Sequence, residues 1–343
     1  MASAPSIPSC KPFRPVSVAP MEHQSTVQST VQLPLEKLTC QLSGHDVDVI
    51  FLDAIQPHGN KYYKLKYNLT FARQQGCSTL ASFGGAWSNH LHALAQVGAE
   101  QGFRTIGIVR GERPTRLSMT LLDAEAQGMH LHFISRGDYR RREDPAFLLA
   151  LQRGFADCYW IPEGGTNQLA IQGVGEIVTE ISRLSPTADL IVLPVATGGT
   201  LAGIVAALPA EQQVLGISVL KGTNTSPDAT RTASSSGARQ GLEADIEDLL
   251  TAITGASERK RNWSVEHRFH CGGYARCPAY LQEFILDWQA HHSIPLDPVY
   301  TGKLFFALSR MLQQAEIDPG VKIVALHTGG GQGRRGYAFL DGT

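Results

Sequence analysis

The chain has 343 residues, of which 43% are hydrophobic and 18% are charged, so it can bury a large core and form two domains. A formal net charge of -1, without a basic stripe interleaved with aromatic residues, argues against nucleic-acid binding and favours small-molecule chemistry. Six scattered cysteines without CxxC spacing argue against a disulfide framework and a zinc site. No apolar run is long enough to span a membrane and no signal peptide is evident, so we expect a cytoplasmic protein.

The first 32 residues are rich in Ser, Pro, Gln and Val, and we expect them to form a flexible leader without chemistry. From residue 47 onward, short apolar runs alternate with segments of helical length, interrupted by a predicted exposed loop at 222–241. This alternation predicts an α/β fold with mainly parallel sheets, in which ligands bind beyond the carboxyl ends of strands. The predicted strands are 47–52, 79–83, 105–109, 130–134, 159–162, 190–195, 214–220 and 322–326.

A lysine stands in the first turn of a predicted helix within residues 59–65, which read Gly-Asn-Lys-Tyr-Tyr-Lys-Leu. Asn60 is the expected cap of this helix. The positive end of the helix dipole and the nearby ammonium of Lys64 both disfavour the protonated form of Lys61. A neutral lysine is a nucleophile toward carbonyl compounds, so the pattern favours a reactive amine over an ordinary exposed lysine.

A second polar segment follows the predicted strand at 79–83. There Gly-Gly-Ala-Trp-Ser-Asn-His, at residues 84–90, leads into another predicted helix. Ser88 and Asn89 suit the capping of that helix, and the same helix N-terminus attracts a carboxylate. Capping and ligand binding are therefore compatible at this position.

A glycine-rich turn joins the predicted strand at 190–195 to a helix of small and apolar residues. Its glycines let successive backbone N–H groups converge, and the helix N-terminus adds partial positive charge, as a phosphate cradle requires. The spacing fits neither GxxxxGK[ST] nor GxGxxG with a following acidic residue, which disfavours a P-loop hydrolase and a dinucleotide fold. The cradle residues are Thr197, Gly198, Gly199 and Thr200.

A reactive lysine, a cradle for one phosphate and polar loops that open helices together meet the requirements of a pyridoxal phosphate site. In six motifs in register, over roughly residues 40–335, the chain resembles the D-cysteine desulfhydrase and 1-aminocyclopropane-1-carboxylate deaminase family. The motifs are Gly59-Asn60-Lys61-x-x-Lys64-Leu65, Gly85-x-x-Ser88-Asn89-His90, Pro162-x-Gly164-Gly165-x-Asn167, Thr197-Gly198-Gly199-Thr200, Pro298-Val299-Tyr300-Thr301-Gly302-Lys303 and His327-Thr328-Gly329-Gly330.

The resemblance implies a tryptophan synthase β-type fold, or fold type II, with two three-layer α/β/α domains and mainly parallel sheets. Residues 33–61 and 165–343 would form the larger, cofactor-binding domain, and residues 62–164 the smaller one. The implied cofactor is pyridoxal 5'-phosphate, the implied ligand is a small amino acid, and the implied assembly is a homodimer. We expect no nucleic-acid or membrane partner and no metal, because none of the histidine pairs has i,i+4 spacing.

Carried over residue by residue, the resemblance also implies roles in catalysis. Lys61 would hold the cofactor covalently and later move the proton at the substrate Cα. Ser88 would hold the substrate carboxylate, and Asn89 would bond the 3'-oxygen of the cofactor. Tyr274 and Tyr300 would complete the catalytic set, with one ring stacked on the pyridine and a phenol beside the leaving group.

The remaining implied contacts surround this catalytic set. His90 belongs to the Ser-Asn-His motif and is expected to line the site. Trp87 replaces a smaller or amide residue of the family, which predicts a substrate pocket of different shape. The expected substrate contacts are Trp87, Ser88, Asn89 and His90, and the expected cofactor contacts are Lys61, Asn89, Thr197, Gly198, Gly199, Thr200, Thr301 and Thr328.

Two threonines indicate the reaction type. Family members that open the cyclopropane ring resemble one another in having Glu and Leu at the positions of Thr301 and Thr328, whereas the desulfhydrase type has small hydroxyl residues at both. A carboxylate beside the pyridine nitrogen favours its protonation and a strong electron sink, and a hydroxyl does not enforce that charge. We therefore expect α,β-elimination on D-cysteine or a related β-substituted D-amino acid, giving pyruvate, ammonia and sulfide.

Two alternatives stay open. The first is another reaction on the same cofactor, such as ring-opening deamination of 1-aminocyclopropane-1-carboxylate, racemisation, or dehydration of a hydroxy amino acid. The second is a non-catalytic protein that binds pyridoxal phosphate or an amino acid, which the presence of Lys61, Ser88, Tyr274 and Tyr300 disfavours. Turnover separates the second alternative from the others, and product identity separates the reactions.

Overall fold

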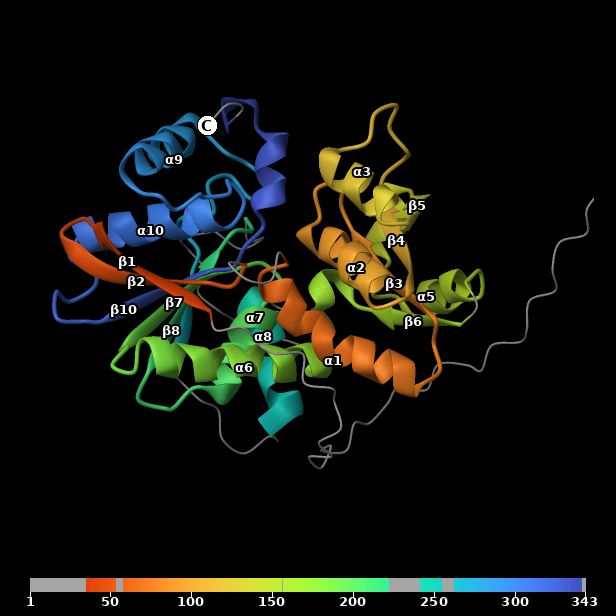
Figure 1. The fold of residues 1–343 in the computed structure, drawn as a ribbon, viewed down its shortest axis with the longest axis horizontal. Helices are drawn as coiled ribbons and strands as arrows, with labels where there is room; N and C mark the ends of the chain where they lie inside the picture. Colours follow the sequence, from red (N-terminus) through yellow and green to blue (C-terminus); the bar gives the residue numbers. More distant parts are fainter. Residues whose placement is uncertain (1–34, 54–57, 156, 222–240, 255–261, 341–343) are drawn as a thin grey trace, which may run out of the picture.

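The computed structural model describes residues 35–53, 58–155, 157–221, 241–254 and 262–340, which form two α/β domains side by side (Figure 1). The predicted leader at 1–32 and residues 222–240 of the predicted loop lie outside the described residues. Within the described ranges, each helix is too short or too polar to cross a lipid bilayer. The five cysteines in those ranges form no disulfide.

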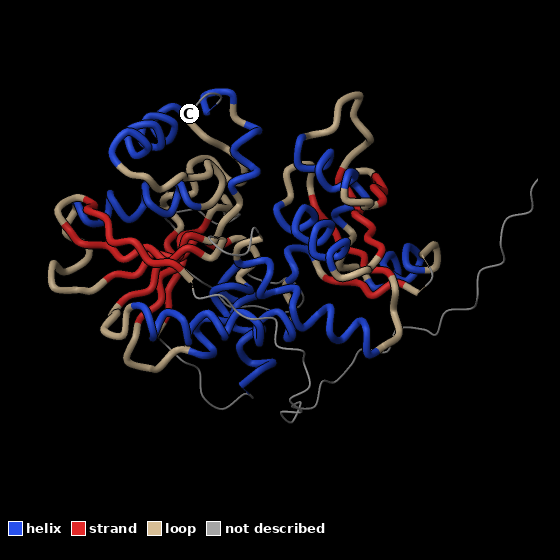
Figure 2. The backbone as a smooth tube through the Cα atoms, in the orientation of Figure 1, coloured by secondary structure: helices blue, strands red, loops and turns tan. Residues whose placement is uncertain are grey.

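The larger domain is built on a six-stranded sheet, seen as one of the two groups of strands in Figure 2. Among its described strands, only the hairpin at one edge is antiparallel, and all other neighbours run parallel. The strands in spatial order are β1 (Glu36–Leu42), β2 (His45–Phe51), β10 (Ile323–His327), β7 (Leu190–Val195), β8 (Gln213–Ser218) and β9 (Trp263–Glu266).

Helices cover both faces of the larger sheet, so this domain has three layers (Figure 1). Strand β7 is almost wholly buried, which explains why it reads as a continuous apolar run instead of an alternating one. On one face lie α9 (Ala279–His291) and α10 (Thr301–Gln313), and on the other lie α6 (Gln168–Leu184), α7 (Gly199–Ala207) and α8 (Gly241–Thr254).

The smaller domain has a four-stranded parallel sheet, also enclosed by helices on both faces. Every residue of its central strand is buried, as expected for a parallel strand between two helical layers. The strands in spatial order are β5 (His130–Ile134), β4 (Arg104–Arg110), β3 (Thr79–Gly84) and β6 (Cys158–Ile161), with α2 (Asn89–Glu100) and α3 (Met119–Ala126) on one face and α4 (Arg136–Arg140) and α5 (Pro145–Gln152) on the other.

Helix α1 (Asn60–Gln74) packs against both domains. Leu65 and Leu69 belong to the core of the smaller domain, whereas Tyr63 belongs to the core of the larger one. The helix approaches α6 so closely that a Cβ on Gly173 would lie 2.0 Å from the Tyr63 carbonyl oxygen, so only glycine fits there. Strands β3 to β6 form the smaller sheet and the other described strands form the larger one, whereas α1 contributes to both cores.

The eight predicted strands are all present, and the predicted α/β fold with mainly parallel sheets is confirmed. Two edge strands, β1 and β9, were not predicted. Strand β1 exposes five of its seven residues, so its sequence lacks the apolar run that marks the other strands. Short 3-10 turns complete the described chain at η1 (Glu163–Gly165), η2 (Gly331–Gly336) and η3 (Ala338–Leu340).

Candidate active site

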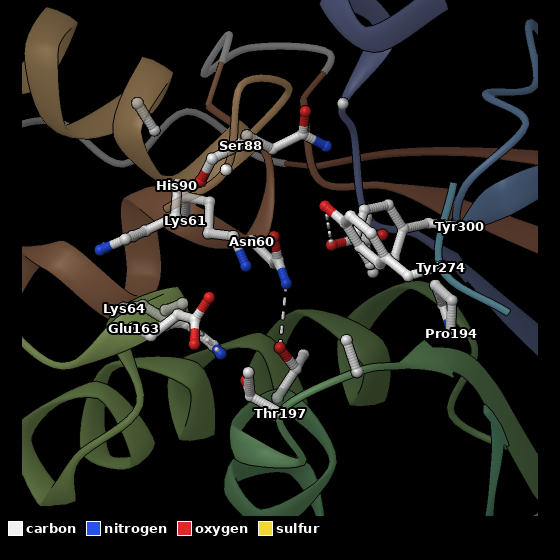
Figure 3. A pocket seen from close by; sticks show the side chains of 18 of the residues that line it. Asn60, Lys61, Lys64, Ser88, His90, Glu163, Pro194, Thr197, Tyr274 and Tyr300 are labelled. Carbon is white, nitrogen blue, oxygen red and sulfur yellow. Dashed lines mark hydrogen bonds between the residues drawn. The ribbon is translucent and has the colours of Figure 1, made fainter. Parts of the chain in front are cut away.

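A cavity of about 510 Å³ is lined by residues of both domains. Three of its lining segments follow the carboxyl ends of β3, β7 and β10, where ligands of parallel sheets bind. Figure 3 shows Tyr274 and Tyr300 on one side, Lys61 and Glu163 on the other, and Thr197 below. The predicted lysine, cradle and tyrosines therefore share one cavity.

Lys61 is the second residue of α1, and no described residue forms a hydrogen bond with its ε-amino group. Burial lowers the pKa of this amine from its ordinary value to about 8. About a tenth of the amine is then neutral at pH 7, far more than for an ordinary lysine, and the neutral form is the one that attacks a carbonyl group. The predicted depression of this pKa is thus present, although burial causes it and not the neighbouring charge that the sequence suggested.

The start of α1 differs from the sequence prediction. Its capping residue is Gly59, which has a φ of 53°, and Asn60 makes no side-chain cap. Instead, the Asn60 amide donates to Thr200 Oγ1 at 2.9 Å, across the cavity. A Cβ on Gly59 would lie 2.2 Å from the Thr328 carbonyl oxygen, so glycine lets the lysine approach the end of β10. The expected Asn60 cap was therefore wrong, and Asn60 instead joins α1 to the cradle.

The predicted cradle lies at the N-terminus of α7. Gly198 precedes the helix with a left-handed φ of 76°, and Thr200 in its first turn receives the Asn60 hydrogen bond. The Thr197 hydroxyl lies 2.8 Å from that of Thr166. Free backbone N–H groups, a helix N-terminus and hydroxyls suit a phosphate group.

Lys64 lies beside this cradle, although the sequence assigned it only a supporting charge. Its Nζ donates to the Gly164 carbonyl and to Thr166 Oγ1, both at 3.2 Å. A Cβ on Gly199 would lie 3.1 Å from the same nitrogen. Burial and then the charge of Lys61 lower the pKa of Lys64 well below its ordinary value. An anion at the cradle would offset that cost, so Lys64 could hold the phosphate.

The start of α2 forms the opposite part of the cavity. Ser88 caps the helix by accepting from the Leu91 N–H at 3.2 Å, so its hydroxyl still has a proton to donate. Asn89 Oδ1 accepts from Gln332 of the larger domain at 2.9 Å. The predicted carboxylate site thus has both a free hydroxyl proton and a helix N-terminus.

His90 is buried, and its Nε2 lies 2.8 Å from the Ser82 hydroxyl. Burial and the charges of Lys61 and Lys64 hold the pKa of His90 well below its ordinary value, so the ring is neutral. Its Nδ1 is buried without a hydrogen-bond partner among the described residues. His90 is one of the residues that line the cavity, as the sequence predicted.

Tyr274 and Tyr300 meet at their hydroxyls, which lie 3.4 Å apart, with the rings in an edge-to-face arrangement (Figure 3). Burial raises the pKa of both phenols, more strongly for Tyr300. Both hydroxyls therefore keep their protons at neutral pH, although the Tyr274 side chain is 40% exposed. Both can therefore serve as proton donors.

Trp87 and Thr301 are absent from the residues that line the cavity. A Cβ on Gly336 would lie 3.1 Å from the Trp87 ring, which therefore packs against η2. Thr301 is fully buried and donates its hydroxyl to Asp297 Oδ2 at 2.7 Å. Thr328, in contrast, lines the cavity at the end of β10. The roles expected of Trp87 and Thr301 stay predictions without support from their positions.

One wall of the cavity was not predicted from the sequence. It is formed by Arg110, Tyr139, Arg142 and Glu163. Two signals were present in the sequence. Arg110 ends an apolar strand, and Glu163 is one of the two variable residues of the motif at 162–167. The cavity is also lined by His58, His92 and Gln332, which were not predicted.

The residues present fit pyridoxal phosphate. The Lys61 amine, which has no hydrogen-bond partner among the described residues, suits the aldehyde, and the glycine and threonine cradle beside the buried Lys64 suits the phosphate. In the part of the chain that the structure describes, no three His, Cys, Asp or Glu residues are grouped to hold a metal ion.

The comparisons with known proteins agree with this geometry. The family described as "Pyridoxal-phosphate dependent enzyme" matches residues 29–329. The chain is 28% identical, over 79% of its length and 80% of the relative, to a putative 1-aminocyclopropane-1-carboxylate deaminase of Pyrococcus abyssi. It is also 28% identical to a bifunctional D-cysteine desulfhydrase/1-aminocyclopropane-1-carboxylate deaminase, mitochondrial, of Arabidopsis thaliana, over 79% and 68% of the two chains.

A solved structure shares the fold. The crystal structure of an ACC deaminase homologue superposes with a TM-score of 0.73 and 26% identity, and covers 90% of this chain and 94% of that one. This protein thus has the fold type II architecture and depends on pyridoxal phosphate. It belongs to the family of pyridoxal-phosphate dependent enzymes, and within that family it is similar to proteins named as 1-aminocyclopropane-1-carboxylate deaminases and as a D-cysteine desulfhydrase.

Proposed function

We propose that the protein catalyses α,β-elimination on D-cysteine or a related β-substituted D-amino acid. The observation that carries this proposal is the hydroxyl of Thr328 at the end of β10, in a cavity whose only carboxylate among the described lining residues, Glu163, is already bonded to an arginine and a tyrosine. No described carboxylate is therefore free to enforce a charge on the pyridine nitrogen. Expulsion of a thiolate needs less electron withdrawal than cleavage of a carbon–carbon bond.

The side chains in the cavity can divide the work of the reaction. Ser88 and the N-terminus of α2 would hold the substrate carboxylate and fix the orientation of Cα. Lys61, with a pKa of about 8, would take the proton from Cα. Tyr274 or Tyr300 would donate a proton to the leaving sulfur. When bound, pyridoxal phosphate supplies an electron sink for the electron pair left at Cα.

The overall reaction balances with one water molecule. D-cysteine and water give pyruvate, ammonium and hydrogen sulfide, and no oxidant or reductant is needed. The Cα–H and Cβ–S bonds break, and hydrolysis then replaces the nitrogen with oxygen. Exclusion of bulk water during the first step favours elimination over side reactions.

A second candidate is ring opening of 1-aminocyclopropane-1-carboxylate to 2-oxobutyrate and ammonia. The names of the relatives favour it, because the Pyrococcus abyssi and Arabidopsis thaliana proteins both carry that activity in their names. The same lysine and carboxylate site would serve this reaction. Only the product separates the two candidates.

Product identity tests the proposal. The cofactor-loaded protein is incubated in separate reactions with D-cysteine, L-cysteine and 1-aminocyclopropane-1-carboxylate, and pyruvate, 2-oxobutyrate and sulfide are measured. We expect pyruvate and sulfide in equal amounts from D-cysteine and little turnover of the other two compounds. Formation of 2-oxobutyrate as the dominant product would establish the second candidate instead.

A further inference from the structure

The wall formed by Arg110, Tyr139, Arg142 and Glu163 holds one positive charge that no described residue neutralises. Arg142 Nε lies 2.5 Å from Glu163 Oε2, and the Tyr139 hydroxyl donates to Glu163 Oε1 at 2.5 Å. Both oxygens of this carboxylate are therefore occupied. Arg110 forms no ion pair with any described residue, and its guanidinium lies 5.8 Å from the centre of the Tyr139 ring.

Arg110 is an exposed residue that lines the cavity beside the reaction site. It ends β4, and its neighbour Val109 pairs with Gly84 of β3, so Arg110 lies at the same sheet edge as the loop that leads to Ser88. Arg110 lines the same cavity as Ser88 and Lys61. Figure 3 shows Glu163 of this wall across the cavity from Tyr274 and Tyr300, the predicted proton donors to the leaving group.

The other anions of the reaction already have suitable sites. The cofactor phosphate fits the α7 N-terminus and Lys64, and the substrate α-carboxylate fits Ser88 at the start of α2. Arg110 is left without an anion. A guanidinium binds planar anions such as carboxylates through paired hydrogen bonds, whereas a thiol or an amide offers it much less.

We propose that the preferred substrates are β-substituted D-alanines whose leaving group carries a second anionic group, and that Arg110 binds this group. This assignment rests on the proposed elimination and narrows its substrate class. Arg110 is then a residue that determines specificity, and Tyr139 positions it through ring contact. Elimination of such a compound releases pyruvate, ammonium and an anionic thiol, with the same bonds broken as for D-cysteine.

A matched pair of substrates tests the assignment. S-carboxymethyl-D-cysteine and S-carbamoylmethyl-D-cysteine are nearly equal in size and differ in the charge of the terminal group. The rate of pyruvate release gives kcat/KM for each compound. The ratio of kcat/KM for the acid to kcat/KM for the amide is then compared among variants. Because each variant acts on the same two compounds, their difference in leaving-group strength cancels. We expect the ratio to fall by about tenfold in Arg110→Gln, as for loss of one charged hydrogen-bonded contact, and less in Arg110→Lys.

The control is Arg140→Gln, which makes the same charge change on α4 at an exposed residue outside the cavity lining. Its ratio should equal that of the unaltered protein. An unchanged ratio in Arg110→Gln would overturn the assignment. An equal fall for both substrates would also overturn it, because Arg110 would then bind the α-carboxylate that the two compounds share.

A binding measurement separates failure of this assignment from failure of the proposed elimination. If D-cysteine and both of these compounds release no pyruvate, the elimination is refuted, and calorimetry with the holoenzyme then compares D-glutamate with D-glutamine. Tighter binding of the acid that Arg110→Gln removes and Arg140→Gln retains would support an anion site at Arg110. Equal binding of the two compounds would refute that site independently of turnover.

Discussion

Burial of the Lys61 side chain determines the pH at which its amine becomes reactive. Because burial lowers its pKa to about 8, the amine is mostly protonated below pH 7 and mostly neutral above pH 9. An ordinary lysine reaches the same neutral fraction only about two pH units higher. The lysine is therefore prepared for reaction before the cofactor arrives.

The rate at which the apoenzyme attaches pyridoxal phosphate should follow this titration. We expect the rate constant to rise with pH and to level off above pH 8 to 9, because only the neutral amine of Lys61 attacks a carbonyl. Stopped-flow absorbance from pH 6.5 to 9.5 measures it, and Lys61→Ala should show no attachment. A rate that climbs tenfold per pH unit through pH 9.5 would contradict the lowered pKa.

At the residue scale, the sequence predicted which residues line the cavity better than it predicted their hydrogen-bond partners. Lys61, Ser88 and Tyr274 all line the cavity as expected. Asn60 was assigned to a cap because Asn is a good capping residue, but its amide bonds Thr200, which lies 140 residues away in sequence. Local propensity cannot reveal such a partner, because the partner is set by how two elements pack.

Helix α2 combines a structural cap and a proposed substrate contact in one side chain. Replacing Ser88 with Ala removes the hydrogen bond to Leu91 and should cost about 1 kcal/mol of unfolding free energy. It should also lower kcat/KM at least tenfold, mainly through KM, because the carboxylate loses a donor. Urea unfolding and pyruvate release measure the two effects.

The control for this substitution is Ser135→Ala. Ser135 caps α4 by accepting from the Asp138 N–H at 3.0 Å and does not line the cavity. It should lose similar stability and keep its activity. If the two variants lose activity equally, then Ser88 acts only as a cap.

Helix α10 carries a buried lysine that holds the loop of Tyr274. Lys303 is fully buried, and its Nζ donates to the carbonyl of Gly273, the residue before Tyr274, at 2.6 Å. Burial lowers the pKa of Lys303 to about 8. The unfolded chain therefore binds more protons than the native one between pH 8 and about 10.5, so this group destabilises the fold below pH 8 and less as pH rises.

We expect the unfolding free energy of the unaltered protein to rise relative to that of Lys303→Met as pH increases from 7.5 to 9.5. The variant lacks the titrating amine, so subtraction removes the effects of the other lysines. Urea unfolding at each pH measures this difference. A difference that is constant across the range would contradict the lowered pKa of Lys303.

At the element scale, strands enclosed by helices were predictable and exposed edge strands were not. Strand β3 is buried at every residue and reads as an apolar run, whereas β1 begins with two charged residues, exposes most of its length and pairs with β2. The sequence therefore predicted the centre of each sheet and missed the edges of the larger one.

Across the whole molecule, η2 of the larger domain reaches α3 of the smaller one (Figure 1). Arg335 pairs with Asp123, and the ring of His92 lies 3.2 Å from the same carboxylate. The hydrogen bond from Arg335 holds the pKa of Asp123 below its ordinary value. This contact joins the two sides of the cavity, because His92 also lines it.

Arg335→Gln should raise KM for the substrate several-fold while unfolding free energy falls by less than about 1 kcal/mol, because the pair is partly exposed. Steady-state kinetics at low and high salt measure the effect, which salt should reproduce in part in the unaltered protein. Arg113→Gln is the control, since its pair with Glu125 lies within the smaller domain. Equal KM values for the two variants would refute a role for the contact between domains.

The wall formed by Arg110, Tyr139, Arg142 and Glu163 shows why part of the site could not be predicted. Arg110, Tyr139 and Glu163 come from a strand end, a short helix and a 3-10 turn that only the smaller sheet brings together.

The homodimer stays a prediction, which sedimentation of the purified protein would check.

The most direct test of the central claim compares the cofactor-loaded protein with Lys61→Ala in the presence of D-cysteine. Pyruvate and sulfide are measured together over time. We expect both products in equal amounts from the unaltered protein and a loss of at least about 1,000-fold in the variant, because the amine acts in both cofactor attachment and proton transfer. Release of both products at an undiminished rate from Lys61→Ala would contradict the account, as would no release from an unaltered protein that has cofactor bound at Lys61.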